Sequence, residues 1–267
     1  MNALPFNPLQ LREVFHLEFL RRLGGKLSPK SYAVKGGVNL RFFFGSVRYS
    51  EDMDLDIAAP DVDRLKALVT GILSSPAFSD QLRPFGIREI RPPHMERAKQ
   101  TETTQRFKVH LLTVSGEDLF TKVEFSRRGF KGTTGVDIVS DTILRSYRMT
   151  PVWVPHYNLS SAIAQKTEAL AGRPVVQARD IFDLHILISR IGPEPAAAAV
   201  PGRALCRKAQ ERVFEAEFVL FRDTVLDYLS LDDRTRFDRP EVWDDIKLRV
   251  SGYLEDLCER PTKRTAD

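Results

Sequence analysis

The stretch of residues 35–57, KGGVNLRFFFGSVRYSEDMDLDI, decides which fold the sequence predicts. Its last six residues, 52–57, alternate strictly between acidic and apolar side chains, which predicts a β-strand. Successive side chains of a strand point to opposite faces, so Asp52, Asp54 and Asp56 are expected on one face. The opposite face, turned toward the core, takes Met53, Leu55 and Ile57.

Two glycines stand upstream of these acids, between a predicted strand over residues 32–34 and a predicted helix over residues 38–44. Gly36 and Gly37 predict a turn in which the backbone can approach a ligand closely, and free N–H groups at a helix start favour phosphate. Alone, the glycines indicate a plain turn and the acids a solvated strand face, but together they favour a site. Asp56 is expected outside that site, in a supporting or solvent-exposed position.

The acids of this strand indicate a metal site. Neighbouring carboxylates repel each other, and a divalent cation offsets the repulsion. Mg²⁺ prefers a few carboxylates together with phosphate oxygens, and paired metals stabilise both the attacking and the leaving oxygen of an in-line displacement. A third acid is expected from a neighbouring strand, where Glu124 is favoured over Glu102 and Asp118. We therefore expect Asp52, Asp54 and Glu124 to hold Mg²⁺, with Mn²⁺ as the alternative.

Composition narrows the class of protein. The 267 residues carry a net charge of +4 and a pI near 9.1, which permits a nucleic-acid partner without requiring one. Cys206 and Cys258 are far apart and the histidines are scattered, so neither a disulfide framework nor a zinc site of cysteines or histidines is expected. Without a signal-peptide pattern or a long apolar run, the expected location is the cytoplasm, with no membrane partner.

The periodicity along the chain predicts an α+β half over residues 1–150 and a helical half over residues 151–267. The first half is expected to open with a helix from Asn7-Pro8 to Gly24-Gly25, and its sheet is expected to end near residue 140. Further elements are expected as a helix capped by Asp61, strands over 86–91, 107–114 and 119–125, helices over 158–171, 178–191, 202–229 and 240–257, a surface connection over 193–201 and a disordered tail over 260–267.

Several short motifs occur in a fixed order over residues 30–190. They are Lys35-Gly36-Gly37, Leu40-Arg41, Arg48-x-Ser50-x-Asp52-x-Asp54, Lys122-x-Glu124, Lys166-x-x-Ala169-Leu170-x-x-Arg173 and Arg179-Asp180-x-x-Asp183. This ordered set resembles the AbiEii/AbiGii toxins, nucleotidyltransferase-like proteins of type IV toxin–antitoxin and phage-abortive (phage-defence) systems, a broad group that includes the MenT toxins. The resemblance implies a DNA polymerase β-like nucleotidyltransferase core with a helical C-terminal domain.

The resemblance also implies an activity. Its substrate would be an NTP, either GTP or a pyrimidine triphosphate, with Mg²⁺. The acceptor would be the 3′ end of tRNA, where added nucleotides block charging and stop growth. A cognate antitoxin would be encoded nearby.

Roles for the remaining motif residues follow from this resemblance. Lys166 and Arg173 lie two helical turns apart on one face, where both can neutralise triphosphate charge. Asp183 is expected to orient the acceptor hydroxyl or to take its proton, and Arg48 and Ser50 to contact phosphate. The alternative for the helical charges is an ordinary salt-bridged helix surface.

The sequence departs from the family pattern at two places. Val38 stands where Thr or Ser usually follows the two glycines, and Ala164-Gln165 stands where many members have Gly-Ser. Both changes remove hydroxyl groups that can hold phosphate, which bears on the affinity for the nucleotide and on its choice. The alternative functions are an NTP-binding module with little turnover, a nucleotidyltransferase acting on small molecules such as aminoglycosides, and an adenylyltransferase that modifies proteins.

Overall fold

The computed structural model describes residues 6–92, 100–192 and 202–259. The chain divides into two compact units, which are described separately. The first consists of Met1–Phe43, Tyr49–Phe130 and Thr134–Tyr157, and the second of Phe44–Arg48, Lys131–Thr133 and Asn158–Asp267. The expected surface connection over 193–201 and the expected tail over 260–267 lie outside the described residues.

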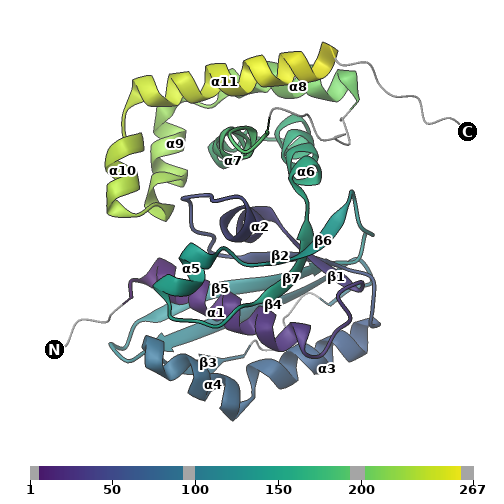
Figure 1. Ribbon diagram of the computed structural model, residues 1–267, viewed down its shortest axis with the longest axis vertical. Coiled ribbons are helices and arrows are strands. Elements are labelled where there is room, and N and C mark those ends of the chain that lie inside the picture. The colour runs from purple at the N-terminus through teal and green to yellow at the C-terminus, as the bar shows by residue number, and fades with distance from the viewer. Residues whose placement is uncertain (1–5, 93–99, 193–201, 260–267) are drawn as a thin grey trace, which may run out of the picture. The chain divides into compact units, whose positions relative to one another are not determined.

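The first unit is built on a seven-stranded sheet with the order β3-β4-β5-β2-β1-β7-β6 (Figure 1). Strands β2 and β5 are parallel, as are β1 and β7, and the remaining neighbours are antiparallel. The bounds are β1 Tyr32–Lys35, β2 Met53–Ile57, β3 Ile87–Arg91, β4 Thr104–Thr113, β5 Asp118–Ser126, β6 Thr134–Ile138 and β7 Trp153–Tyr157.

The expected end of the sheet near residue 140 is wrong. Strand β7 comes after that point and pairs with β1, while β6 forms an edge of the sheet. Two features make these strands difficult to predict from the sequence. Strand β7 contains Pro155, which argues against a strand, and β6 is exposed along most of its length, so it lacks the alternation that a buried face produces.

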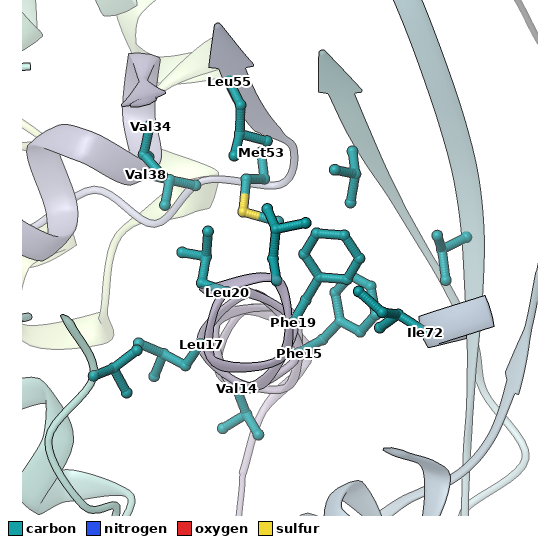
Figure 2. Packing of buried hydrophobic residues seen from close by; sticks show 14 of the residues in the cluster. Val14, Phe15, Leu17, Phe19, Leu20, Val34, Val38, Met53, Leu55 and Ile72 are labelled. Atoms are coloured by element: carbon teal, nitrogen blue, oxygen red, sulfur yellow. The ribbon is translucent and has the colours of Figure 1, made fainter. Parts of the chain in front are cut away.

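Helix α1 (Pro8–Gly24) forms the centre of the core of this unit. Asn7 caps it by accepting from the backbone N–H of Gln10, as expected from the Asn-Pro start. Figure 2 looks along α1, with Phe15, Phe19 and Leu20 around its axis and Met53 of β2 directed toward it. The apolar face of β2 is therefore fixed against α1, which leaves its acids to the other face.

The other helices of this unit are α2 Gly36–Phe43, α3 Val62–Leu73, α4 Pro76–Leu82 and α5 Asp141–Ser146, with a 3₁₀ turn at Arg83–Phe85. Helices α1, α3 and α4 gather on the same side of the sheet (Figure 1). Asp61 caps α3 as expected, accepting from the backbone N–H of Arg64.

The second unit is helical. Its elements are α6 Leu159–Gly172, α7 Ala178–Ile188, α8 Arg203–Arg212, α9 Phe218–Thr224, α10 Leu231–Phe237 and α11 Pro240–Glu259, with 3₁₀ turns at Val213–Glu215 and Leu226–Tyr228. None of the described helices has both the length and the apolar character needed to cross a membrane.

The single helix expected over residues 202–229 is wrong, because the chain breaks there between α8 and α9. The indole N–H of Trp243 donates to the carbonyl of Ala216 at 2.9 Å. If α8 continued, this carbonyl would instead accept a hydrogen bond from a backbone N–H of the helix. The Trp243 ring also stacks on Phe221, with ring centroids 4.3 Å apart. Packing between distant residues therefore sets this break, which helical periodicity alone does not reveal.

Candidate active site

The parallel pairing of β2 with β5 brings two acids together. Asp54 lies opposite Glu124 in the register, and both side chains are half-buried on the same face. Neighbouring strands lie about 4.8 Å apart. Asp52 directly precedes β2, and the Lys122 ammonium lies 2.9 Å from its Oδ2 and 3.9 Å from Oε2 of Glu124. Lys122 thus lies between Asp52 and Glu124, and its charge also acts on Asp54.

The two alternatives for the third acid lie elsewhere. Asp118 begins β5, and its Oδ1 contacts Nδ1 of His110 at 3.0 Å. It is six residues from Glu124 along an extended strand, or about 20 Å. Glu102 is exposed in the turn before β4. Glu124 is therefore the acid that joins Asp54.

Gly36 forms the corner between β1 and α2 beside this cluster. Helix α2 begins at Gly36 and not at Val38 as expected. Gly36 has φ +66°, a left-handed conformation that favours glycine, and a Cβ atom added there would lie 3.2 Å from Oδ2 of Asp54. The glycine therefore permits the start of α2, with Gly37 as its second residue, to lie directly against an acid of the cluster.

The charges around Asp54 work against its ionisation. Burial raises the pKa of this carboxyl, and the nearby Glu124 and Asp52 carboxylates raise it further, while Lys122 and Lys35 lower it. The net direction is upward, so folding places a carboxylate where its charge is poorly compensated by protein groups. A bound cation would offset that cost.

Whether a metal ion can bind to this acid cluster depends on the oxygen atoms that the cluster offers as ligands. No group of three or more His, Cys, Asp or Glu side chains within the described ranges is arranged as a metal site. Oδ1 of Asp52 is nevertheless buried and has no hydrogen-bond partner among the described residues. A buried acceptor without a donor costs free energy, and a carboxylate oxygen is the ligand that a hard cation prefers. The residues therefore suit Mg²⁺ in their chemistry.

Two bases, Arg106 on β4 and Lys122 on β5, lie against the acids. The Arg106 guanidinium lies 2.7 Å from Oε2 of Glu124, in addition to the contacts of Lys122. Alternation within β5 already places Lys122 on the face of Glu124. Arg106 could be found only from the β4–β5 register, in which it lies opposite Glu124.

Asp56 is buried rather than solvent-exposed, and it belongs to a separate group. Its carboxylate accepts from Nζ of Lys35 at 2.5 Å and from the hydroxyl of Tyr157 at 2.6 Å. This group ties β2 to β1 and β7. Asp56 therefore supports the sheet next to the acid cluster.

Ser50 and Arg48 have different surroundings. The hydroxyl of Ser50 donates to the backbone carbonyl of Asp52 at 2.8 Å, which holds the chain at the start of the acid cluster. Arg48 belongs to the second unit, where its guanidinium is buried against Asp183, with Nη2 2.9 Å from Oδ2.

The charged residues of α6 and α7 form a buried ion network in the second unit. Nζ of Lys166 lies 3.0 Å from Oδ1 of Asp180 and 2.6 Å from Oδ2 of Asp183. Nε of Arg173 lies 2.7 Å from Oδ2 of Asp180. The salt bridges of the alternative reading therefore form, but both aspartates are fully buried instead of lying on a helix surface.

The protonation state of this network follows from its pairing. Burial raises the pKa of Asp183, but the charges of Arg48 and Lys166 outweigh it and hold the pKa below the usual value. Burial lowers the pKa of Lys166, but Asp183 and Asp180 outweigh it and raise the pKa. Asp183 is therefore ionised at neutral pH, with both oxygens accepting from cations, an arrangement suited to holding Arg48 and Lys166.

Known protein structures share the fold of this chain. The solved structure of MenT4, a nucleotidyltransferase toxin of Mycobacterium tuberculosis, is similar with a TM-score of 0.59 and 19% identity, over 96% of this chain and 85% of that one. JHP933 of Helicobacter pylori is similar with a TM-score of 0.55 and 16% identity, over 95% and 93% of the two chains. Among curated proteins, none is close enough to count as a relative.

The α+β fold class expected from the sequence is confirmed by the structure and by these similarities. The family described as nucleotidyl transferase AbiEii toxin, type IV toxin–antitoxin system, matches residues 18–260. Nearly the whole chain lies within that match. The chain therefore belongs to the AbiEii family of toxins from type IV toxin–antitoxin systems, and it is a nucleotidyltransferase.

Proposed function

We propose that this toxin transfers a nucleotide from an NTP to the 3′ hydroxyl of an RNA, with tRNA as the acceptor, in a reaction that depends on Mg²⁺ or Mn²⁺. The observation that carries the proposal is the register that places Asp54 beside Glu124, together with the buried, unpartnered Oδ1 of Asp52. Carboxylates on the neighbouring strands β2 and β5 and at the start of β2 are suited to a cation-bound triphosphate.

Each part of the cluster has a place in this reaction. Asp52, Asp54 and Glu124 would hold the metal, which when bound neutralises triphosphate charge and stabilises the attacking and leaving oxygens. The N–H groups at the start of α2, at Gly36 and Gly37, favour phosphate. The protein contributes mainly positioning and electrostatic stabilisation, as in phosphoryl transfer generally.

The proposal also gives a role to the charged residues of the helical unit. Lys166 and Arg173 would contribute positive charge toward the triphosphate, with Arg48 held alongside them through Asp183. The network has three cations and two carboxylates, so the pairing leaves positive charge in excess. Charge of that sign suits a phosphate group.

The biological setting follows the family. We propose that the reaction arrests growth by blocking the acceptor end of tRNA, and that an antitoxin encoded nearby counteracts it. Membership of a type IV toxin–antitoxin family supports this setting. The net charge of +4 is compatible with an RNA acceptor.

A labelling experiment separates this proposal from the alternatives. The purified protein is incubated with each α-³²P-labelled NTP, Mg²⁺, total tRNA, cell lysate protein and an aminoglycoside. We expect label on tRNA, removed by 3′-end trimming. Label on protein or on the aminoglycoside would contradict the RNA acceptor, and NTP binding without any labelled product would contradict transfer.

A matched pair of variants shows whether the acid cluster is responsible. Glu124→Gln is expected to reduce label transfer to background, because it removes the carboxylate that lies opposite Asp54. Glu117→Gln changes an exposed acid in the turn of the same hairpin and should leave transfer unchanged. Equal activity of the two variants would contradict the assignment of Glu124.

A further inference from the structure

A buried polar chain lies behind Asp52, on the side of β5 that faces α1. Thr121 is fully buried in β5, and its hydroxyl lies 2.7 Å from the carbonyl oxygen of Glu51. The same hydroxyl lies 3.0 Å from Nε2 of His16, which is buried in α1. Buried polar groups almost always have hydrogen-bond partners. The donor and the acceptor of each hydrogen bond in this chain of residues can therefore be assigned.

The hydrogen bonds have only one consistent direction. A carbonyl oxygen only accepts, so the single proton of the Thr121 hydroxyl goes to Glu51. The hydroxyl must then accept from His16, which requires the proton on Nε2. Burial, with a further effect of Arg12, lowers the pKa of His16 to about 3. His16 is therefore a neutral donor with a defined tautomer, and the chain runs from His16 through Thr121 to Glu51.

This chain ends on the peptide group that precedes Asp52. Asp52 lies just outside the β2 ladder, whose pairing with β5 begins at Met53, so sheet hydrogen bonds do not fix its orientation. Thr121 holds the peptide before Asp52, and the Ser50 hydroxyl holds the carbonyl after it. Arg12 contributes a third tie, with its guanidinium 3.3 Å from the Glu51 carboxylate.

We propose that His16 and Thr121 are positioning residues for Asp52, which fix the peptide groups around it so that its unpartnered carboxylate oxygen is held ready for a cation. This inference rests on the proposed function, since it gives Asp52 the role of a metal ligand. Residues that orient a ligand from behind typically change metal affinity or activity by about 10- to 100-fold when they are altered.

The test compares variants of Thr121. Thr121→Val keeps the shape and removes the hydroxyl, and Thr121→Ser restores it. Thr113→Val removes another fully buried threonine hydroxyl, at the far end of β4, and serves as the control for stability. The readouts are kcat for label transfer, the urea midpoint of unfolding, and the Kd for Mn²⁺ measured by electron paramagnetic resonance on nucleotide-free protein.

We expect Thr121→Val to lower kcat and to raise the Kd for Mn²⁺, each by about 10- to 100-fold. Thr121→Ser should recover most of both values, and Thr113→Val should change neither. His16→Gln, which keeps an N–H donor near the position of Nε2, should retain more activity than His16→Leu. The His16 pair gives a second measurement if Thr121→Val does not fold.

Two results would overturn the inference. One is a Thr121→Val protein with the kcat and Mn²⁺ affinity of the wild type. The other is a loss of activity in Thr113→Val equal to that in Thr121→Val, which would reduce the effect to general stability. Both leave the proposed function intact as long as the wild type transfers label and Asp52→Asn does not, whereas an inactive wild type would reject the proposed function itself.

Discussion

At Asp54, a position proposed to bind a metal ion, the charge of the side chain works against the stability of the fold. Its raised pKa means that the folded protein binds a proton at Asp54 more tightly than the unfolded chain does. The stability that this group provides is complete below its ordinary pKa and is lost as the pH rises through the folded value. At neutral pH the charge of Asp54 therefore opposes folding.

Removing the charge of Asp54 should raise the stability of the fold and lower the activity. Asp54→Asn is expected to raise the urea midpoint of unfolding at pH 7 in metal-free buffer, because it removes a half-buried carboxylate whose charge is opposed by its acidic neighbours. The same change should reduce label transfer to background. The gain in stability should shrink as the pH falls toward 4. A lower midpoint at pH 7 would contradict the electrostatic account of this cluster.

The proposed site also depends on the glycine at Gly36. Gly36→Ala is expected to destabilise the protein by about 1–2 kcal/mol, the usual cost of a left-handed conformation for a residue with a Cβ, and to lower label transfer. The reason is that the new Cβ would crowd Oδ2 of Asp54 at 3.2 Å. Urea denaturation and the labelling assay measure the two effects.

Gly71 in α3 offers a matched control. A Cβ there meets no atom within 4 Å, and alanine is favoured over glycine in a helix by about 1 kcal/mol. Gly71→Ala should therefore raise stability and leave transfer unchanged. If both alanine variants behave alike, the special role of Gly36 is wrong.

At the scale of elements, the pairing of α6 with α7 depends on a buried ion network. Asp183 accepts from Arg48 and Lys166, and its lowered pKa means that it stabilises the fold above its ordinary pKa. That stabilisation is lost as the pH falls through the depressed folded value. Acid should therefore weaken this unit, in contrast to its effect through Asp54.

Breaking this network should be costly. Asp183→Asn is expected to destabilise the protein by about 3–5 kcal/mol, because it leaves two buried cations without a full partner. Asp141→Asn breaks an exposed pair with Arg145 on α5 and should cause almost no change. Urea denaturation at pH 7 compares them, and similar losses for both variants would contradict the role assigned to burial.

The elements that could be predicted from the sequence are those whose signals are local. Caps at Asn7 and Asp61 and the alternation in β2 located α1, α3 and the acid strand. The break between α8 and α9 could not be predicted, because it depends on Trp243 from a distant helix. Helix α10 was missed as well, although Ser230 caps it and its spacing to Asp233 is a local signal.

In the candidate site, too, local signals could be predicted from the sequence and contacts between distant segments could not. Alternation predicted that Asp54 and Glu124 each face one side of a strand, but only the parallel register shows that they are neighbours. Tyr157 lies 101 residues from its partner Asp56, and Glu51 lies 70 residues from its partner Thr121, so no spacing rule along the sequence could have paired them. Sequence reasoning therefore found the acids and missed most of the residues that hold them.

At the scale of the whole molecule, residues suited to phosphate chemistry occur in both units. The acid cluster lies in the sheet unit, and the Lys166 network lies in the helical unit. The family match extends over both units, from residue 18 to residue 260. We propose that the acid cluster of the sheet unit performs the transfer on which toxicity depends.

Asp52→Ala tests this claim most directly, measured both as growth arrest on induction in cells and as transfer of label from NTP to tRNA in vitro. We predict that the variant folds, with a urea midpoint no lower than that of the wild type, and that it loses both growth arrest and label transfer. A folded Asp52→Ala protein that remains fully toxic and fully active would contradict the account.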